Sequence, residues 1–224
     1  MFEGSGWQQY TSDALSGTGY QATKSTVTSP ARSGDGAAKV YMPDPSSTSH
    51  YMWRANNVTW KMGDDAWIGI SMRLGDDWKL TESQLRNDGS TFASLFGFRG
   101  DVANGPGAGI YATWRNGQPM FSSRTISGSV GATSGEVFFG PYTKNVWYDF
   151  VIHVKWSSDP NVGIREYWLN GKKVAEWRGA TMYTPMTVRN RIGIYQGGGV
   201  DHARSLYYDN HRIGKSYAEV DPAR

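Results

Sequence analysis

The sequence contains no cysteine, which excludes disulfide bonds, thiolate metal sites and a cysteine nucleophile. No apolar run approaches the roughly 18 residues that a membrane-spanning helix needs, so we expect no membrane segment. The first ten residues, MFEGSGWQQY, lack a basic start and an apolar stretch, and we therefore expect no signal peptide. The length of 224 residues suits a single domain over residues 1–224.

Leucine is also scarce, with seven occurrences, whereas the chain has 28 glycine, 13 tyrosine, 10 tryptophan and 8 phenylalanine residues. Helical domains rely on leucine, alanine, glutamate and lysine, while aromatic and β-branched side chains favour the half-buried surface of a sheet. Frequent glycine is typical of many tight turns. The composition therefore predicts an all-β protein.

The net charge is small, because 23 Lys and Arg residues stand against 20 Asp and Glu residues, and no run of five basic residues occurs. A nucleic-acid-binding protein usually has a stronger and more clustered excess, so we expect no nucleic-acid partner. A modest excess that is gathered in one groove suits an anionic polymer of another kind.

Short alternating segments separated by turn signals predict about ten strands. They are Ala38–Met42, Ala66–Leu74, Thr91–Arg99, Gly109–Arg115, Val137–Phe139, Trp147–Trp156, Ile164–Leu169, Lys173–Trp177, Arg189–Gln196 and Ser205–Ile213. Asn116-Gly117 and Asn170-Gly171 are two-residue hairpin signals. A helical turn is expected at Leu80–Arg86 and a long loop from Ser122 to Gly135. These features predict a single-domain β-jelly roll, a concanavalin-like sandwich of two antiparallel sheets.

Several common site motifs are absent from the sequence. No phosphate-binding glycine loop, no GxSxG serine elbow and no zinc-type histidine spacing occurs. Asp64-Asp65 and Asp76-Asp77 leave a structural calcium site open, although acidic pairs in turns are usually only solvated. No predicted strand carries the E-x-[DE] pair of a glycoside hydrolase, but carboxylates on different strands keep that class open.

Three predicted strands carry polar or aromatic side chains of interest. In NRIGIYQ, alternation places Arg191 and Tyr195 on the face opposite two isoleucines. In DFVIHVKW, His153 and Lys155 share the face opposite the apolar side chains, and in IREYWLNG the side of Trp168 is ambiguous. On pattern alone, such residues are more often ordinary surface than catalytic.

Read in order, several segments resemble the jelly-roll polysaccharide lyases, which include alginate, glucuronan and heparin-I-type lyases. The segments are FEG, WRAN, WIGISMRL, WYDFVIHVKWS, WLNGKKV, RIGIYQ and LYYDNHRIG. The resemblance extends from Phe2 to about Gly214 and rests on the order and spacing of the segments. It implies a lyase that cleaves a uronic-acid-containing anionic polysaccharide by β-elimination, with no metal or organic cofactor required.

The resemblance also implies site residues. The family's pattern of a basic residue followed by x-G-x-Y matches Arg191 to Tyr195, which makes Tyr195 the expected catalytic tyrosine. The family's R-x-E-type motif matches Arg54-Ala55-Asn56, with asparagine in place of the acid.

The family's Gln-x-His strand falls on LFGFRG, where Gly97 and Arg99 stand in place of glutamine and histidine. Three interpretations follow from this departure. Tyr195 acts alone as both base and acid, His153 substitutes for the missing histidine, or the protein is not a standard lyase.

The chemistry of β-elimination explains these residue types. The C5 proton of a uronate is too weakly acidic to remove unless the adjacent carboxylate is neutralised, a role we assign to Arg54 and Arg99. Tyr195 then takes the proton and returns one to the leaving O4. A free tyrosine has a pKa of about 10, so nearby cations must favour its ionised form. Substrate binding is expected of a further set: Asn56, Trp114, Lys155, Trp168, Arg191 and Gln196.

Two other functions remain open. The missing Gln-x-His pattern favours a non-catalytic carbohydrate-binding module, and a jelly-roll glycoside hydrolase is the second alternative. For the lyase we expect a monomer that is secreted or periplasmic, because its substrate is a large polymer. The sequence does not name that polymer.

Overall fold

The computed structural model describes residues 10–13, 23–42, 49–55, 58–78, 93–102, 106–126, 133–196 and 204–224. Fourteen strands and one short helix form the regular structure of these residues. The strands are β1 (Tyr10–Asp13), β2 (Thr23–Val27), β3 (Ala37–Met42), β4 (Ser49–Ala55), β5 (Asp65–Leu74), β6 (Ala93–Gly100), β7 (Ile110–Arg115), β8 (Gln118–Ile126), β9 (Thr133–Pro141), β10 (Trp147–Lys155), β11 (Ile164–Leu169), β12 (Lys172–Arg178), β13 (Val188–Gln196) and β14 (Arg204–Gly214). The helix is α2 (Tyr217–Val220).

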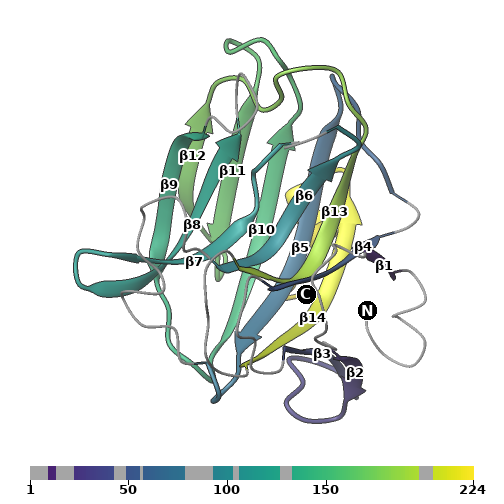
Figure 1. The fold of residues 1–224 in the computed structure, drawn as a ribbon, viewed down its shortest axis with the longest axis vertical. Helices are drawn as coiled ribbons and strands as arrows, with labels where there is room; N and C mark the ends of the chain where they lie inside the picture. Colours follow the sequence, from purple (N-terminus) through teal and green to yellow (C-terminus); the bar gives the residue numbers. More distant parts are fainter. Residues whose placement is uncertain are drawn as a thin grey trace.

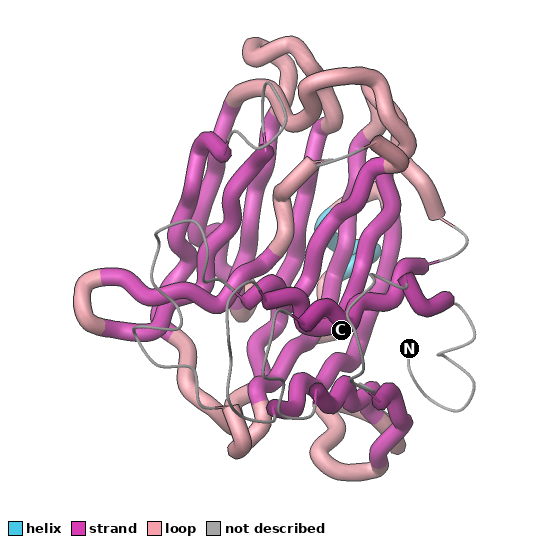
Figure 2. Tube along the Cα trace, in the orientation of Figure 1, coloured by secondary structure: helices cyan, strands magenta, loops and turns pink. Residues whose placement is uncertain are grey.

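The strands form two antiparallel sheets, which lie in two layers (Figures 1 and 2). Sheet A has the order β1-β4-β13-β6-β7-β8-β9, and sheet B has the order β12-β11-β10-β5-β14-β3-β2. Strands distant in the sequence are neighbours in both sheets, as where β13 lies between β4 and β6. The predicted all-β jelly-roll sandwich is therefore confirmed.

All ten predicted strands are present, and four more strands, β1, β2, β4 and β8, were not predicted. The long loop predicted from Ser122 to Gly135 is wrong, because β8 and β9 pair across this segment. Its many Ser, Thr and Gly residues suggested a loop, yet backbone pairing holds most of them in extended strands. The predicted helical turn at Leu80–Arg86 lies outside the described residues.

Both predicted hairpin turns are confirmed. Asn116 and Gly117 connect β7 to β8 with φ values of 51° and 79°. Asn170 and Gly171 connect β11 to β12 with φ values of 49° and 80°. Two successive positive φ values define a type I′ turn, whose twist matches that of the strands it joins.

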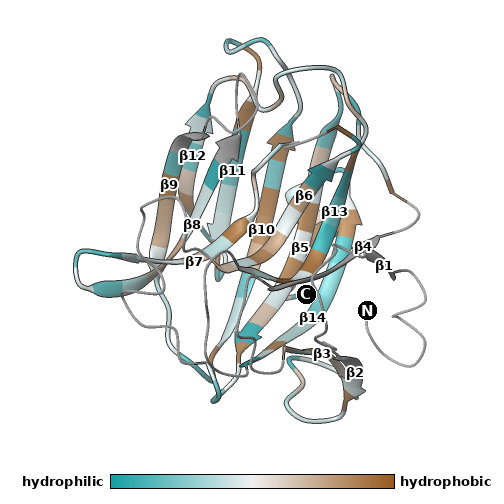
Figure 3. Ribbon diagram, in the orientation of Figure 1, coloured by the Kyte–Doolittle hydropathy of each residue, from teal (hydrophilic) through white to brown (hydrophobic). Residues whose placement is uncertain are grey.

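The hydrophobic core lies between the two sheets, and bands of apolar and polar residues follow one another along strands such as β5 and β10 (Figure 3). Ring contacts cross from one sheet to the other. Phe98 of β6 meets Trp156, which follows β10, at 5.1 Å between ring centroids, and Phe121 of β8 meets Phe150 of β10 at 5.0 Å. Each sheet therefore has one buried face and one outer face, and the two outer faces lie on opposite sides of the molecule.

Helix α2 covers part of the outer face of sheet B. The backbone carbonyl of Val220 lies so close to Gly69 in β5 that a Cβ atom at Gly69 would be 1.7 Å from it. Only glycine allows this approach, because any side chain would displace the helix. The C-terminal segment thus packs on sheet B, on the side opposite to the outer face of sheet A.

A tyrosine hydroxyl connects the two sheets at an irregularity in sheet A. Tyr208 of β14 is fully buried, and its hydroxyl accepts a hydrogen bond from the Gly193 N–H at 2.8 Å and donates one to the Leu95 carbonyl at 2.5 Å. These backbone groups lie where the pairing of β13 with β6 shifts register between Ile192 and Tyr195. A bulge interrupts the backbone ladder, and the buried hydroxyl pairs with the groups at the interruption.

We expect Tyr208→Phe to lower the free energy of unfolding by about 1–3 kcal/mol, because it leaves buried backbone groups without their partner. The comparison is Tyr207→Phe, a half-buried tyrosine of the same strand whose ring lies near Lys39 and Arg73. Urea unfolding of the two variants and the wild type measures the difference. Equal stability of the two variants would contradict the structural role of the Tyr208 hydroxyl.

Candidate active site

A row of residues crosses five neighbouring strands of sheet A. The register places His50, Tyr195, Ser94, Tyr111 and Ser122 opposite one another in β4, β13, β6, β7 and β8. Positions directly opposite in antiparallel strands lie on the same face of the sheet. We call these five positions the central row.

The central row lies on the outer face of sheet A. Ile192 and Ile194 of β13 are fully buried in the core, so Tyr195 and Arg191 alternate to the opposite face. Tyr195 itself is half-buried there. Tyr195 and Arg191, which the sequence assigned to the site, therefore lie on one surface of the molecule.

The bulge determines which residue of β6 faces Tyr195. The pairing of β6 with β7 also shifts register. Ser94 and Phe96 of β6 pair with the consecutive residues Tyr111 and Ile110 of β7, so Leu95 is an additional residue in β6. Leu95 and Phe96 are both fully buried in consecutive positions, and Ser94 is paired with Tyr195. Counted by simple alternation from Arg99, Leu95 would lie on the outer face and Ser94 in the core. The register shifts reverse this order, so Ser94 could not be recognised from the sequence.

The outer face of sheet A is rich in arginine. The five strands of the central row contain six arginines and neither aspartate nor glutamate. Register and alternation place all six positions on the outer face. They are Arg54, Arg99, Arg115, Arg124, Arg189 and Arg191.

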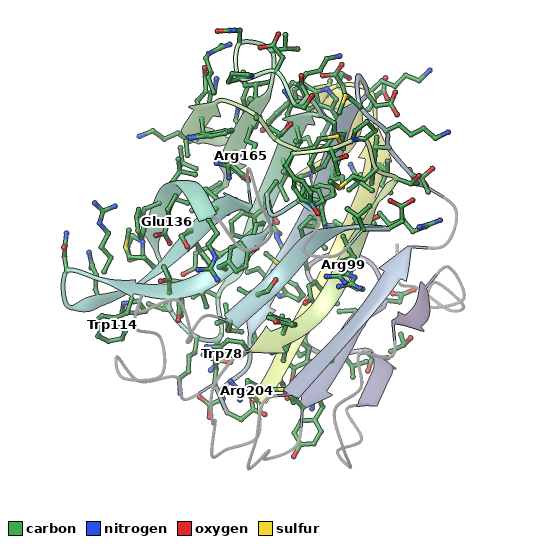
Figure 4. All side chains as sticks on the ribbon, turned by 45° about the horizontal axis from the view of Figure 1, so that its top comes forward. Trp78, Arg99, Trp114, Glu136, Arg165 and Arg204 are labelled. Atoms are coloured by element: carbon green, nitrogen blue, oxygen red, sulfur yellow. The ribbon has the colours of Figure 1, made fainter. Side chains whose placement is uncertain are left out.

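Two pairs of these arginine positions are directly opposite each other. Arg191 is opposite Arg54 of β4, and Arg189 is opposite Arg99 of β6, which Figure 4 shows over the middle of the sheet. Arg191 is 7% exposed, and burial lowers its pKa to about 10, while the charge of Tyr195 acts in the opposite direction. Its guanidinium therefore stays positive at neutral pH. Arg189 was not among the residues singled out from the sequence.

Tyr111 and Arg124 extend the site along the central row. The Arg124 guanidinium lies 5.2 Å from the centroid of the Tyr111 ring. Desolvation raises the pKa of Tyr111, although the charge and hydrogen bond of Arg124 oppose this shift. No sequence motif indicated this pair; the available signal was the alternation in IYATWR, which separates Tyr111 from two buried neighbours.

His153 and Lys155 lie on the other sheet. His153 is in β10 of sheet B, where Nδ1 is 2.6 Å from Glu166 and Nε2 is 2.9 Å from Asp65. Its ring stacks on Trp67 at 4.0 Å, and Lys155 donates to Asp65 at 2.9 Å. Their side chains are therefore on the face opposite to Tyr195, and the structure does not bring them to the central row.

The remaining predicted binding residues are also dispersed. Trp168 lies on the outer face of sheet B, 5.7 Å from Trp67 and 5.3 Å from Tyr217 between ring centroids. Trp114 is half-buried and packs against the hydrophobic core near the β7–β8 hairpin (Figure 4). Asn56 and the side chain of Gln196 lie outside the described residues.

The acidic pairs that were considered for calcium have protein partners. Asp64 accepts a hydrogen bond from the Lys61 N–H, Asp77 binds the backbone and hydroxyl of Ser205, and Asp76 contacts Asn145. Within the described ranges, no group of three or more His, Asp or Glu side chains is placed to hold a metal ion. Nor does any helix in this part of the chain have the length and apolar character needed to cross a membrane.

The family assignment follows from a comparison over nearly the whole chain. A family model described as polysaccharide lyase (Polysacc_lyase) matches residues 3–212. The chain belongs to this polysaccharide lyase family. The resemblance identified from the sequence is therefore confirmed, and the protein is a polysaccharide lyase.

Solved structures share its fold. An endo-β-1,4-glucuronan lyase from the fungus Trichoderma reesei is 22% identical, with a TM-score of 0.70 over 98% of this chain and 95% of that chain. The cellulose-induced protein Cip1 is 14% identical, with a TM-score of 0.60 over 94% and 93%. The alginate lyase Aly36B is 15% identical, with a TM-score of 0.57 over 81% and 82%. No match is found among curated protein sequences.

The contacts of His153 predict a structural role for this residue in the lyase. Each of its ring nitrogens lies within hydrogen-bonding distance of a carboxylate, Glu166 at Nδ1 and Asp65 at Nε2. We expect His153→Gln to lower the free energy of unfolding by about 1 kcal/mol above the ordinary carboxyl pKa of about 4, since these bonds are partly screened by solvent. Turnover should remain unchanged. Urea unfolding and a steady-state assay measure the two effects.

The stability difference should disappear in acid. Burial acts to raise the pKa values of Asp65 and Glu166, but hydrogen bonds from Lys155, Lys173 and His153 outweigh it and lower both pKa values. Their stabilisation is therefore present above the ordinary carboxyl pKa of about 4 and is lost as the pH falls through the lowered values. A loss of turnover by His153→Gln with unchanged stability would contradict this assignment.

Proposed function

We propose that this lyase cleaves a uronic-acid-containing polysaccharide by β-elimination on the outer face of sheet A, with Tyr195 as the base and acid. The observation that carries the proposal is the charge of this face. Six arginine positions and no carboxylate surround a half-buried tyrosine on five adjacent strands. A surface of this kind attracts a polyanion and stabilises the negative charge that develops in the reaction.

Arg191 and Arg54 neutralise the carboxylate of the reacting sugar in this proposal. Arg191 and Arg54 are opposite each other, and Arg191 precedes Tyr195 by four residues in β13, which is roughly 13 Å between Cα atoms. An arginine and a tyrosine side chain that reach toward each other from these positions leave room for one sugar ring between them. Arg191 is almost completely buried, so its charge acts in a medium that screens it weakly. Removal of the C5 proton places negative charge on this carboxylate, and the guanidinium groups stabilise it.

Tyr195 moves the protons. In its phenolate form the Tyr195 oxygen takes the C5 proton. The same hydroxyl returns a proton to O4 as the glycosidic bond breaks and the C4–C5 double bond forms. His50 is the second candidate for proton transfer, because its position is directly opposite Tyr195. His153 is not part of the proposal, since it lies on sheet B.

The similar structures support a uronate polymer as the substrate class. Two of the proteins are named for glucuronan and alginate, which are both polymers of uronic acids. A glycoside hydrolase needs two carboxyl groups on either side of the scissile bond. The five strands of the central row contain none, so the geometry favours elimination over hydrolysis.

We expect Tyr195→Phe to lower kcat by roughly 10²–10⁴-fold, the range for loss of a general acid or base. Its Tm should stay within about 2 °C of the wild type, because a half-buried surface hydroxyl contributes little to stability. The assay follows ultraviolet absorbance of the C4–C5 double bond on glucuronan, alginate, ulvan and glycosaminoglycans. Tyr207→Phe on sheet B is the matched control and should retain full activity.

The same experiment separates the alternatives. New reducing ends without an absorbance increase would indicate hydrolysis, and polymer binding without either signal would indicate a binding module. Full activity of Tyr195→Phe would remove the tyrosine from the mechanism. If His50→Gln and Tyr195→Phe both lose kcat to a similar extent, proton transfer is assigned to both His50 and Tyr195.

A further inference from the structure

Arg99 and Arg189 form a pair of like charges at one end of the arginine-rich face. They are directly opposite each other in β6 and β13, and both are half-buried. Like charges at directly opposite positions of a sheet are destabilising. Two arginines elsewhere in the described chain, Arg32 and Arg178, do have acidic partners, Asp149 and Glu176. The residues that the structure describes offer no such partner to Arg99 or Arg189.

The nearest acid does not neutralise this pair. Asp101 follows β6, and its carboxylate accepts a hydrogen bond from the Thr187 N–H at 2.9 Å. That backbone bond is the largest cause of its lowered pKa, and the charge of Arg189 adds to it. Asp101 thus influences Arg189 through space without forming an ion pair with it. The two arginine positions remain directly opposite each other on the outer face.

The pair is too far from Tyr195 to act on the reacting sugar. Arg189 precedes Tyr195 by six residues in the same strand, which corresponds to roughly 20 Å of extended backbone. The row of Arg191 lies between them on the same face. Arg99, which the sequence resemblance places at the reacting carboxylate, lies one row beyond Arg191 in the register of β6 and β13.

We propose that Arg99 and Arg189 form a second carboxylate-binding subsite, which holds a uronate unit away from the point of cleavage and positions the polymer on sheet A. This inference rests on the proposed function. Guanidinium groups bind carboxylates with paired, directional hydrogen bonds, and a bound carboxylate relieves the repulsion between the two cations. Because the bound unit does not react, the subsite contributes to affinity and to substrate position, and not to the chemical step.

Substitution of Arg189 tests the subsite. We expect Arg189→Gln and Arg99→Gln each to raise KM by roughly tenfold, the effect of one charge-assisted hydrogen bond at a solvent-exposed site, with kcat within about twofold. The Tm of either variant should equal or exceed that of the wild type, because the substitution removes repulsion. The control is Arg178→Gln on sheet B, which removes the same charge from the opposite face and should leave KM unchanged.

A binding experiment keeps this test independent of turnover. Calorimetry with Tyr195→Phe, alone and combined with Arg189→Gln, measures affinity for glucuronan and alginate hexasaccharides and for their methyl esters. We expect Arg189→Gln to weaken binding of the free acids about tenfold and to leave the uncharged esters unaffected. A sulfated hexasaccharide that binds more tightly than the uronates, with the same dependence on Arg189, would assign the subsite to sulfate and overturn the carboxylate proposal.

The outcomes separate the subsite from the proposed function. Wild-type activity with an unchanged KM in both arginine variants overturns the subsite alone. A fall in kcat without a change in KM also overturns it, because the pair would then act in the chemical step. Hexasaccharide binding that depends on Arg189 in a protein without lyase activity supports the subsite and overturns the proposed elimination. Absence of binding to every uronate overturns both.

Discussion

The hydroxyl of Tyr208 is the interaction on which the surface of sheet A depends. It reaches from β14 across the core and pairs with backbone groups of Gly193 and Leu95, where one strand holds an additional residue. An unpaired peptide group in the core costs much more than a hydrogen bond contributes to stability, so the bulge needs this partner. Because side chains alternate with a period of two, the bulge decides that Ser94 and not Leu95 stands beside Tyr195.

The two outer faces differ in how they arrange charge. On sheet B, ion pairs and hydrogen bonds form a continuous series across four strands, through Lys155, Asp65, His153, Glu166 and Lys173. This face is internally neutralised and partly covered by helix α2. The outer face of sheet A carries arginines without acids on its five central strands. The small net charge of the whole chain therefore conceals a local excess of arginine on these five strands.

This separation of charge links the fold to the family's chemistry. A sheet that places two arginines directly opposite each other, as at Arg99 and Arg189, tolerates repulsion between like charges in the free protein. In the proposed function, the repulsion disappears when an anionic chain lies across the face, so the same feature that opposes folding favours binding. The sheet supplies rigid positions for these side chains, since the hairpins and the packed core fix their backbone.

The sequence by itself determined the fold class, the hairpins at Asn116 and Asn170 and the alternation that places Arg191 with Tyr195. These are local properties, because strand alternation and turn conformation depend on neighbouring residues. Only the tertiary structure separated His153 from Tyr195. Their strands, β10 and β13, have polar faces that look equally suitable in the sequence, but β10 belongs to sheet B and β13 to sheet A. The tertiary structure alone also placed Arg189 opposite Arg99. The register between strands that are distant in the sequence depends on core packing and on the bulge, and the sequence of a single strand determines neither.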